Sequence, residues 1–249
     1  MGVLVAEHPG FIEISLDWPD IRNALGPDEG RELRLALEAA NARDDIAAIL
    51  LSATGKAFCA GGNLAEIVRL SQHGESAVRD TVYGEFQGIF RAVAESSVPV
   101  IAAVDGPAVG FGCDLALCGQ VTFVGESGWL AQGWAQVGLI PATGGTLYAG
   151  RRGGPQAVWQ LLAADRVDAA TAERWGLAIA AADARAAAME MAAKLAALPR
   201  PALAATLALS RIDMLDAHLE TALRYQAGFI TGADFAERAA RILSGPNRR

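Results

Sequence analysis

The sequence predicts an α/β fold whose second half is helical. Apolar runs of strand length alternate with amphipathic helical patterns up to about residue 145. Beyond that point strand-like runs nearly disappear, and alanine-rich helical patterns continue towards the end of the chain. The chain has 249 residues, of which 52% are hydrophobic, so it can bury a sizeable core.

The first predicted elements are a β-hairpin, a helix and a buried strand. Runs 3–7 and 11–17 lie on either side of the turn sequence His8-Pro9-Gly10. A helix is predicted from Pro27, because proline suits the first helical position and acidic residues follow in the first turn. The apolar run 47–53 then predicts a buried strand.

The middle of the chain continues the alternation of helix and strand. Residues 77–96 predict a helix, and runs 98–104 and 121–125 predict two more strands. The helical spacing is carried by the apolar residues Val78, Val82, Phe86, Ile89 and Val93. Because Pro199 and Pro201 interrupt the later helices, we divide the chain into an α/β core, 1–198, and a helical C-terminal region, 199–249.

Composition narrows the possible partners. The net charge is −7 and the 21 Lys and Arg residues are scattered, which argues against nucleic-acid binding. The three cysteines, Cys59, Cys113 and Cys118, form no metal-binding spacing, and so sparse a set suits a reducing compartment. No signal peptide or membrane span is evident, so we expect a cytoplasmic protein with no metal and no membrane partner.

Two glycine-rich turns are the strongest functional signal. "GKAFCAGGNLAEI" and "DGPAVGFGCDLAL" each follow a buried strand and lead into a helix. Unpaired backbone N–H groups at such positions favour negative charge, and glycine lets a ligand approach the backbone. We select the N–H groups of Gly62 and Phe111 as the ligand-binding donors. Neither turn matches a P-loop or a dinucleotide fingerprint, and Ser127 does not lie in a hydrolase G-x-S-x-G motif.

Three segments together resemble the crotonase superfamily, the enoyl-CoA hydratase/isomerase family. They are "FCAGGNLAEI", "VPVIAAVDGPAVGFGCDLAL" and "GLIPATGGT", and the resemblance covers nearly the whole chain. It implies a spiral of strand-strand-helix repeats, with a C-terminal helical region that assembles homotrimers or homohexamers. It also implies an acyl-CoA thioester as substrate, with coenzyme A as part of it and no separate cofactor.

The resemblance assigns roles to residues of both turns. The backbone N–H groups of Gly62 and Phe111 would hold the thioester carbonyl and stabilise an enolate. The substrate-binding positions implied in the same way are Arg22, Ala24, Lys56, Ala57, Phe58, Ala60, Asn63, Leu64 and Trp134. Lys56 and Arg22 could meet the phosphates of coenzyme A, or could equally be solvated surface cations.

The sequence departs from the hydratase pattern at the two catalytic glutamates. Their places are taken by Asp114 and Trp134. Asp114 keeps a carboxylate and is the one matched acid/base, whereas Trp134 cannot accept a proton and is expected to line the acyl pocket. Ala142 stands where some isomerases and dehalogenases of the family carry a carboxylate. Other acid/base candidates are Glu66, Tyr83 and Glu126.

These observations predict an enzyme of the enoyl-CoA hydratase/isomerase class with an oxyanion hole. Asp114 would be its one carboxylate at a position that matches a catalytic glutamate of the family. Two alternatives stay open. The first is another reaction of the family, such as thioester hydrolysis or decarboxylation. The second is an acyl-CoA-binding protein that lost its chemistry with the second glutamate. The acyl group and the pathway are not readable from the sequence.

Overall fold

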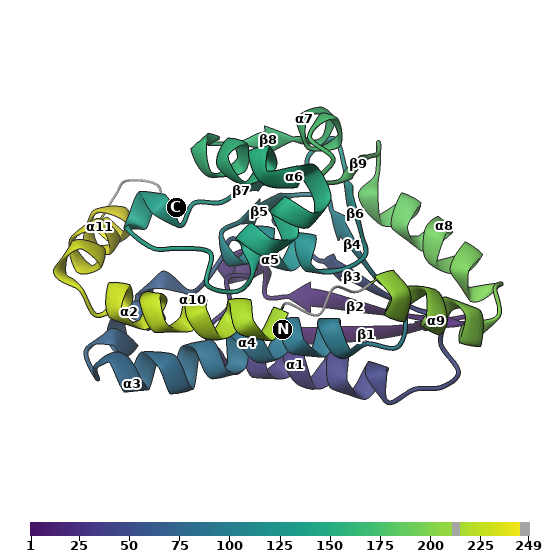
Figure 1. Cartoon of the computed structure of the whole chain (residues 1–249), viewed down its shortest axis with the longest axis horizontal. Coiled ribbons are helices and arrows are strands. Elements are labelled where there is room, and N and C mark those ends of the chain that lie inside the picture. The colour runs from purple at the N-terminus through teal and green to yellow at the C-terminus, as the bar shows by residue number, and fades with distance from the viewer. Residues whose placement is uncertain (211–214, 245–249) are drawn as a thin grey trace.

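The computed structural model describes residues 1–210 and 215–244, which form two β-sheets surrounded by helices (Figure 1). The larger sheet has six strands in the order β1-β2-β3-β4-β6-β9. These strands span Gly2–His8, Phe11–Asp17, Ala48–Ala53, Val100–Val104, Val121–Val124 and Ile179–Ala180. β1 and β2 are antiparallel, and the remaining neighbours are parallel. The predicted hairpin and the three predicted strands are therefore confirmed.

The smaller sheet has three strands in the order β5-β7-β8. They span Pro107–Val109, Trp129–Ala131 and Val167–Asp168. β5 lies inside the second glycine-rich segment, where the sequence indicated only a turn before a helix. The parallel pairing of β5 with β7 holds this segment in place before the chain enters α5 (Phe111–Cys118).

Helices cover both faces of the larger sheet. On one face α1 (Pro27–Asn41) packs against β1 and β2 and beside α4 (Gly84–Glu95). On the other face α8 (Ala184–Ala196) crosses β3, β4 and β6, as Figure 1 shows in green. Successive residues of a strand point to opposite faces, so Ile49 joins the core beneath α1 and Leu50 the core beneath α8. Burial on both faces explains the continuous apolar runs of the parallel strands.

The predicted helix 77–96 forms with one irregularity. Residues Val78–Tyr83 are π-helical, and α4 continues from Gly84. All five residues that carried the helical spacing are buried, with at most 1% of each exposed. The helix therefore packs on its predicted face despite the wider turn.

The C-terminal region contributes α9 (Arg200–Ser210), α10 (Leu215–Ile230) and α11 (Ala233–Ser244). α11 packs against η3 (Ala135–Val137) and α2 (Leu64–Ser71), both of which adjoin predicted site segments. The remaining described helices are η1 (Pro19–Ile21), α3 (Glu75–Ala77), α6 (Gly145–Ala163) and α7 (Ala169–Arg174). Among the described residues, we find no helix with the length and apolarity that a bilayer span needs.

Candidate active site

A cavity of about 270 Å³ lies between the two glycine-rich turns, the 133–139 segment and α11. Backbone atoms and apolar side chains dominate its walls, and none of the described residues that line it carries a charged side chain. The first turn and α2 contribute Ala60, Gly61, Gly62, Leu64 and Ile67, and the second turn contributes Val109, Gly110 and Phe111. The far wall is formed by Gly133, Trp134, Gln136, Val137, Leu139 and Ile242.

The Gly61–Gly62 peptide is oriented by a hydrogen bond on its carbonyl side. The N–H of Leu25 donates to the Gly61 carbonyl at 2.9 Å. A trans peptide is planar, so its C=O and N–H point in opposite directions. Holding the Gly61 oxygen against Leu25 therefore directs the Gly62 N–H away from Leu25. Within the described residues this N–H donates no hydrogen bond, and Gly62 lines the cavity.

The Gly110–Phe111 peptide is oriented in the same way. Its carbonyl accepts a hydrogen bond from the backbone N–H of Asp114 at 3.0 Å, in the first turn of α5. Phe111 is the first residue of α5, so its own N–H has no acceptor inside the helix. We find no other acceptor for it in the described part of the chain. The cavity is thus lined by two residues whose backbone donors are unpaired.

The segments that carry the two donors, 59–62 and 107–111, are called the first and second donor segments, and they are hydrogen-bonded to each other. Cys59 N–H donates to the Pro107 carbonyl at 3.1 Å, and Val109 N–H donates to the Cys59 carbonyl at 3.0 Å. Gly112 packs so closely against this bridge that a Cβ there would lie 2.1 Å from the Cys59 carbonyl oxygen. The distance between the two donors is therefore fixed by backbone contacts, and only glycine fits at position 112.

The two turns differ in one respect from the sequence-based expectation. Phe111 begins a helix, as predicted, but Gly62 lies before Asn63, the N-cap of α2. Asn63 Oδ1 accepts a hydrogen bond from the Glu66 N–H. Gly62 instead forms a short bridge with Leu25, so its orientation comes from that pairing rather than from a helix terminus.

Asp114 is completely buried within α5 and is not among the cavity-lining residues. Its carboxylate accepts hydrogen bonds from Gln132 Nε2 at 2.8 Å and from Thr143 Oγ1 at 2.6 Å. Burial raises the pKa of Asp114 to about 7, while the donors Thr143, Gln132, Trp134 and the Gly145 N–H oppose that rise. A carboxyl group with this pKa can gain or lose a proton near neutral pH.

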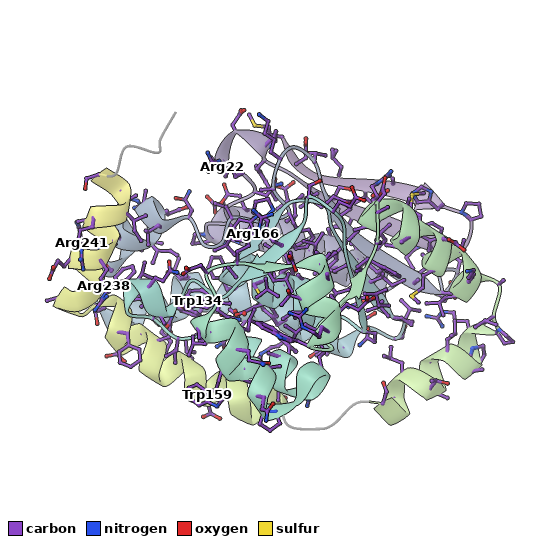
Figure 2. The ribbon with its side chains drawn as sticks, turned by 90° about the horizontal axis from the view of Figure 1, so that it is seen from above. Arg22, Trp134, Trp159, Arg166, Arg238 and Arg241 are labelled. Carbon is purple, nitrogen blue, oxygen red and sulfur yellow. The ribbon has the colours of Figure 1, made fainter. Side chains whose placement is uncertain are left out.

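Trp134 adjoins both this carboxyl group and the cavity. The side chain lines the cavity, and its indole N–H acts on Asp114 strongly enough to lower the pKa of that carboxyl group. The N–H makes no hydrogen bond of good geometry to any described residue and is buried. In Figure 2 Trp134 lies in the interior beside α11, the helix that carries Arg238 and Arg241. The indole therefore links the cavity wall to Asp114, which does not itself line the cavity.

The structure brings some of the predicted site residues to the cavity and leaves others outside it. Those in the lining are Ala60, Gly62, Leu64, Phe111 and Trp134. Arg22 and Lys56 are exposed and Ala24 is half-buried, whereas Ala57 and Phe58 are buried beside a separate small crevice near Asp105 and Arg185. Asn63 caps α2, as described above.

The other acid/base candidates also lie outside the cavity lining. Tyr83 is buried, which raises the pKa of its hydroxyl, and Glu126 is exposed. Partial burial, followed by the neighbouring Glu29, raises the pKa of Glu66. The described residues contain no group of His, Cys, Asp and Glu side chains that could hold a metal ion.

Sequence reasoning missed several residues of the site. Gly112 could have been found from the G-F-G-C spacing, because a second glycine there suggests close backbone contact. Thr143 and Gln132 had no such signal, since they meet Asp114 only through the packing of α5 against later segments. Ile242 enters the cavity from α11, more than 100 residues away in sequence from the rest of the lining.

This chain is a crotonase-fold enzyme. It has the two sheets and covering helices of that fold, and a cavity lined by both glycine-rich turns. The sequence profile described as enoyl-CoA hydratase/isomerase matches residues 6–237. The chain is 34% identical over 250 residues to a Mycobacterium tuberculosis protein named probable enoyl-CoA hydratase, a match that covers 96% of each protein. The chain therefore belongs to the enoyl-CoA hydratase/isomerase family.

Other relatives agree with this assignment. A Rhodobacter capsulatus protein named probable enoyl-CoA hydratase is 34% identical over 169 residues, which are 68% of this chain and 63% of that protein. A crystal structure of an enoyl-CoA hydratase/isomerase from Mycobacterium paratuberculosis has 28% identity and a TM-score of 0.89, covering 96% of this chain and 97% of that one. These comparisons confirm the predicted family and fold.

Proposed function

We propose that the cavity binds an acyl-CoA thioester and that the N–H groups of Gly62 and Phe111 hold its carbonyl oxygen. The observation that carries this proposal is the pair of unpaired N–H groups, which belong to residues of the same cavity and are oriented by hydrogen bonds behind them. Donors held in this way stabilise charge that develops on oxygen when an enolate forms. One such donor is typically worth about 2.7–4 kcal/mol of the reaction barrier.

The acyl group is proposed to be uncharged. Among the described residues, the cavity lining contains no cationic side chain that could pair with a second carboxylate on the substrate. A buried and unpaired charge would be costly in such surroundings. This favours an enoyl-CoA over a malonyl-type thioester, and so argues against decarboxylation.

Asp114 is proposed as the single proton carrier. Its pKa of about 7 suits proton exchange with an acyl group, which the carboxyl group would reach directly or through one water. One carboxylate can move a proton between two carbons, so the reaction we propose is isomerisation of an enoyl-CoA through its enolate. Coenzyme A enters as part of the substrate, with no separate cofactor.

Hydration of an enoyl-CoA is the second candidate. It is favoured by relatives whose names describe them as enoyl-CoA hydratases, among them the crotonyl-CoA hydratase of Syntrophomonas wolfei, 37% identical over 180 residues. Of the two positions at which hydratases of the family carry their catalytic glutamates, only Asp114 keeps a carboxylate in this chain. A water would therefore have one carboxylate partner there. A screen of 2-enoyl-, 3-enoyl- and malonyl-CoA thioesters with product identification separates isomerisation, hydration and decarboxylation.

Ligand binding can be tested separately from catalysis. Acyl-CoA should raise the melting temperature of the protein, since a ligand that binds only the folded state stabilises it. Gly62→Pro should abolish this protection because it removes one donor and also distorts the turn that lines the cavity. Ala65→Pro is the matched control, since Ala65 is exposed, does not line the cavity and lies in the first turn of α2, where proline is tolerated. Equal protection by acyl-CoA and by ATP would contradict a thioester site.

A further inference from the structure

Two consecutive residues beside the first donor segment have left-handed backbones. Arg22 and Asn23 have φ values of 54° and 55°, and they are the two described non-glycine residues with positive φ. Asparagine tolerates this region better than most residues, whereas arginine rarely adopts it. Such a conformation persists only where surrounding contacts impose it. Here the backbone N–H groups of Arg22 and Asn23 donate to the Pro19 and Trp18 carbonyls, and the Asn23 side chain adds further contacts.

The side chain of Asn23 is completely buried and uses three hydrogen bonds to join two stretches of chain. Its Oδ1 accepts from the Trp18 N–H at 2.7 Å. Its Nδ2 donates to the carbonyls of Thr54 at 3.0 Å and Ala57 at 2.9 Å. Asn23 therefore ties the 18–23 turn to the strand end that leads into the first glycine-rich segment.

The residues on either side of Asn23 hold the donor segment itself. Arg22 carbonyl accepts from the Ala60 N–H at 3.0 Å, and Leu25 carbonyl accepts from the Asn63 N–H at 2.7 Å. Between these two bonds, Leu25 N–H donates to the Gly61 carbonyl and so directs the Gly62 N–H. The positions of Arg22 and Leu25 depend on the left-handed turn at Asn23, so the direction of the donor depends on that turn as well.

We infer that Asn23 is a positioning residue of the oxyanion hole, acting on the Gly62 N–H through Leu25 and Gly61. This inference rests on the proposed function, because it gives the Gly62 N–H a part in catalysis. Asn23 does not line the cavity, so it acts without touching the substrate. Its contribution should appear in turnover more than in binding, since a donor of an oxyanion hole acts most strongly where negative charge develops on the carbonyl oxygen.

The test separates backbone conformation from hydrogen bonding. Asn23→Gly allows the left-handed backbone but removes all three side-chain hydrogen bonds. Asn23→Ala removes the same hydrogen bonds and also disfavours the left-handed backbone. Removing a whole oxyanion donor costs about 100- to 1,000-fold in kcat, so a misdirected donor should cost about 10- to 100-fold. We expect that loss in Asn23→Gly with KM changed by less than about threefold, and a larger loss in Asn23→Ala if it folds.

Asn41→Ala is the matched control. Asn41 Nδ2 donates to the Ala92 carbonyl at 2.7 Å, so its removal also costs a side-chain to backbone hydrogen bond, but away from the cavity. It should lower the melting temperature without lowering kcat at a temperature where the protein is folded. Equal kcat losses in Asn41→Ala and Asn23→Gly would show that stability alone is responsible and would overturn the inference.

Hydrogen–deuterium exchange gives a readout that needs no substrate. The amides of Ala60 and Asn63 are hydrogen-bonded to the Arg22–Leu25 segment, so peptides covering 60–63 should exchange faster in Asn23→Gly than in the unmodified protein. Unchanged exchange there would overturn the inference even if the protein turns over acyl-CoA. If these peptides exchange faster in Asn23→Gly but the unmodified protein turns over no thioester, the proposed function is refuted. The positioning role of Asn23 in catalysis is then refuted with it.

Discussion

Gly112 shows how a single residue sets the geometry of the site. Its α-carbon lies against the Cys59 carbonyl, in the bridge that joins the two donor segments. Gly112→Ala should push these segments apart, because a backbone carbonyl cannot turn aside as a flexible side chain can. We expect a loss of about 1–3 kcal/mol in unfolding free energy, typical of overpacking, together with a lower kcat. Denaturant unfolding and steady-state kinetics measure the two effects.

Gly84→Ala is the control for this prediction. Gly84 has a helical φ of −57°, is exposed, and would give a new Cβ no neighbour within 4 Å. Alanine should be neutral there or stabilise by about 0.4–1 kcal/mol. If both substitutions leave stability and turnover unchanged, close packing at Gly112 does not fix the donor positions.

The buried carboxyl group of Asp114 predicts a particular dependence of stability on pH. Burial raises its pKa from the usual 3.8 to about 7. A raised pKa means that the folded state holds the proton more tightly than the unfolded state does. The stability contributed by this protonated group is present in full below about pH 3.8 and is lost as the pH rises through about 7.

We therefore expect Asp114→Asn to remove this contribution to the pH dependence. At pH 5 the protonated carboxyl group and an amide each offer one donor and one acceptor to Thr143 and Gln132, so the two proteins should differ little in unfolding free energy. At pH 8 the unmodified protein buries a charged carboxylate, so Asp114→Asn should be the more stable of the two. The substitution should also nearly abolish turnover while leaving acyl-CoA affinity largely intact. A gap independent of pH would contradict the assigned pKa, and unchanged turnover would remove Asp114 from the mechanism.

At the scale of elements, the turn that begins η3 adjoins both Asp114 and the cavity. Trp134 is the residue before η3, and its indole N–H lowers the pKa of Asp114. Trp134→Phe keeps an aromatic wall but removes the N–H. We expect the pH midpoint of turnover to move upward, with acyl-CoA affinity nearly unchanged. Trp159→Phe is the control, because Trp159 is 69% exposed on α6 and should leave the midpoint in place.

Substitution at position 134 also tests the effect of the missing second carboxylate. Crotonyl-CoA hydration by the unmodified protein should be weak or absent, because Trp134 cannot activate water as a base. Trp134→Glu should raise hydration if the smaller side chain leaves the cavity intact. Product formation can be followed by the absorbance of the enoyl thioester. Efficient hydration by the unmodified protein would refute a mechanism in which isomerisation by one carboxylate is the main reaction.

At the scale of the whole molecule, the cavity depends on elements from both ends of the chain. The first turn, the second turn and α11 all contribute to its lining. Two large apolar side chains late in the chain are exposed: Ile242 of α11, which also lines the cavity, is 52% exposed, and Leu198, just before α9, is 50% exposed. Such surface late in the chain is what a subunit interface would cover.

We therefore predict a homotrimer or homohexamer. Light scattering coupled to size-exclusion chromatography should report a mass three or six times that of the 25.9 kDa chain. Association removes apolar surface from water, so the assembly should persist at micromolar concentration. A monomer at that concentration would contradict the prediction and the oligomerisation role of residues 199–249.

Much of the fold could be predicted from local sequence, because its signals are local. The hairpin, the helix beginning at Pro27 and the apolar parallel strands depend on turn residues, helix-start preferences and continuous burial. The same holds for the two glycine-rich turns. Glycines that follow a buried strand indicate close approach to the backbone, whatever the rest of the chain does.

Only the tertiary structure decided how the donors are directed and which groups surround the carboxylate. Asn23 and Leu25 act on Gly61 although Gly61 is far from both in sequence, and no periodicity marks these residues. The position of Asp114 in the first turn of a helix does not by itself determine the pKa of its carboxyl group. Burial prevails, because Trp134 and the neighbouring segments exclude water from the carboxyl group. Sequence order determines which strands and turns can form, whereas desolvation and hydrogen-bond direction depend on neighbours that only folding brings together.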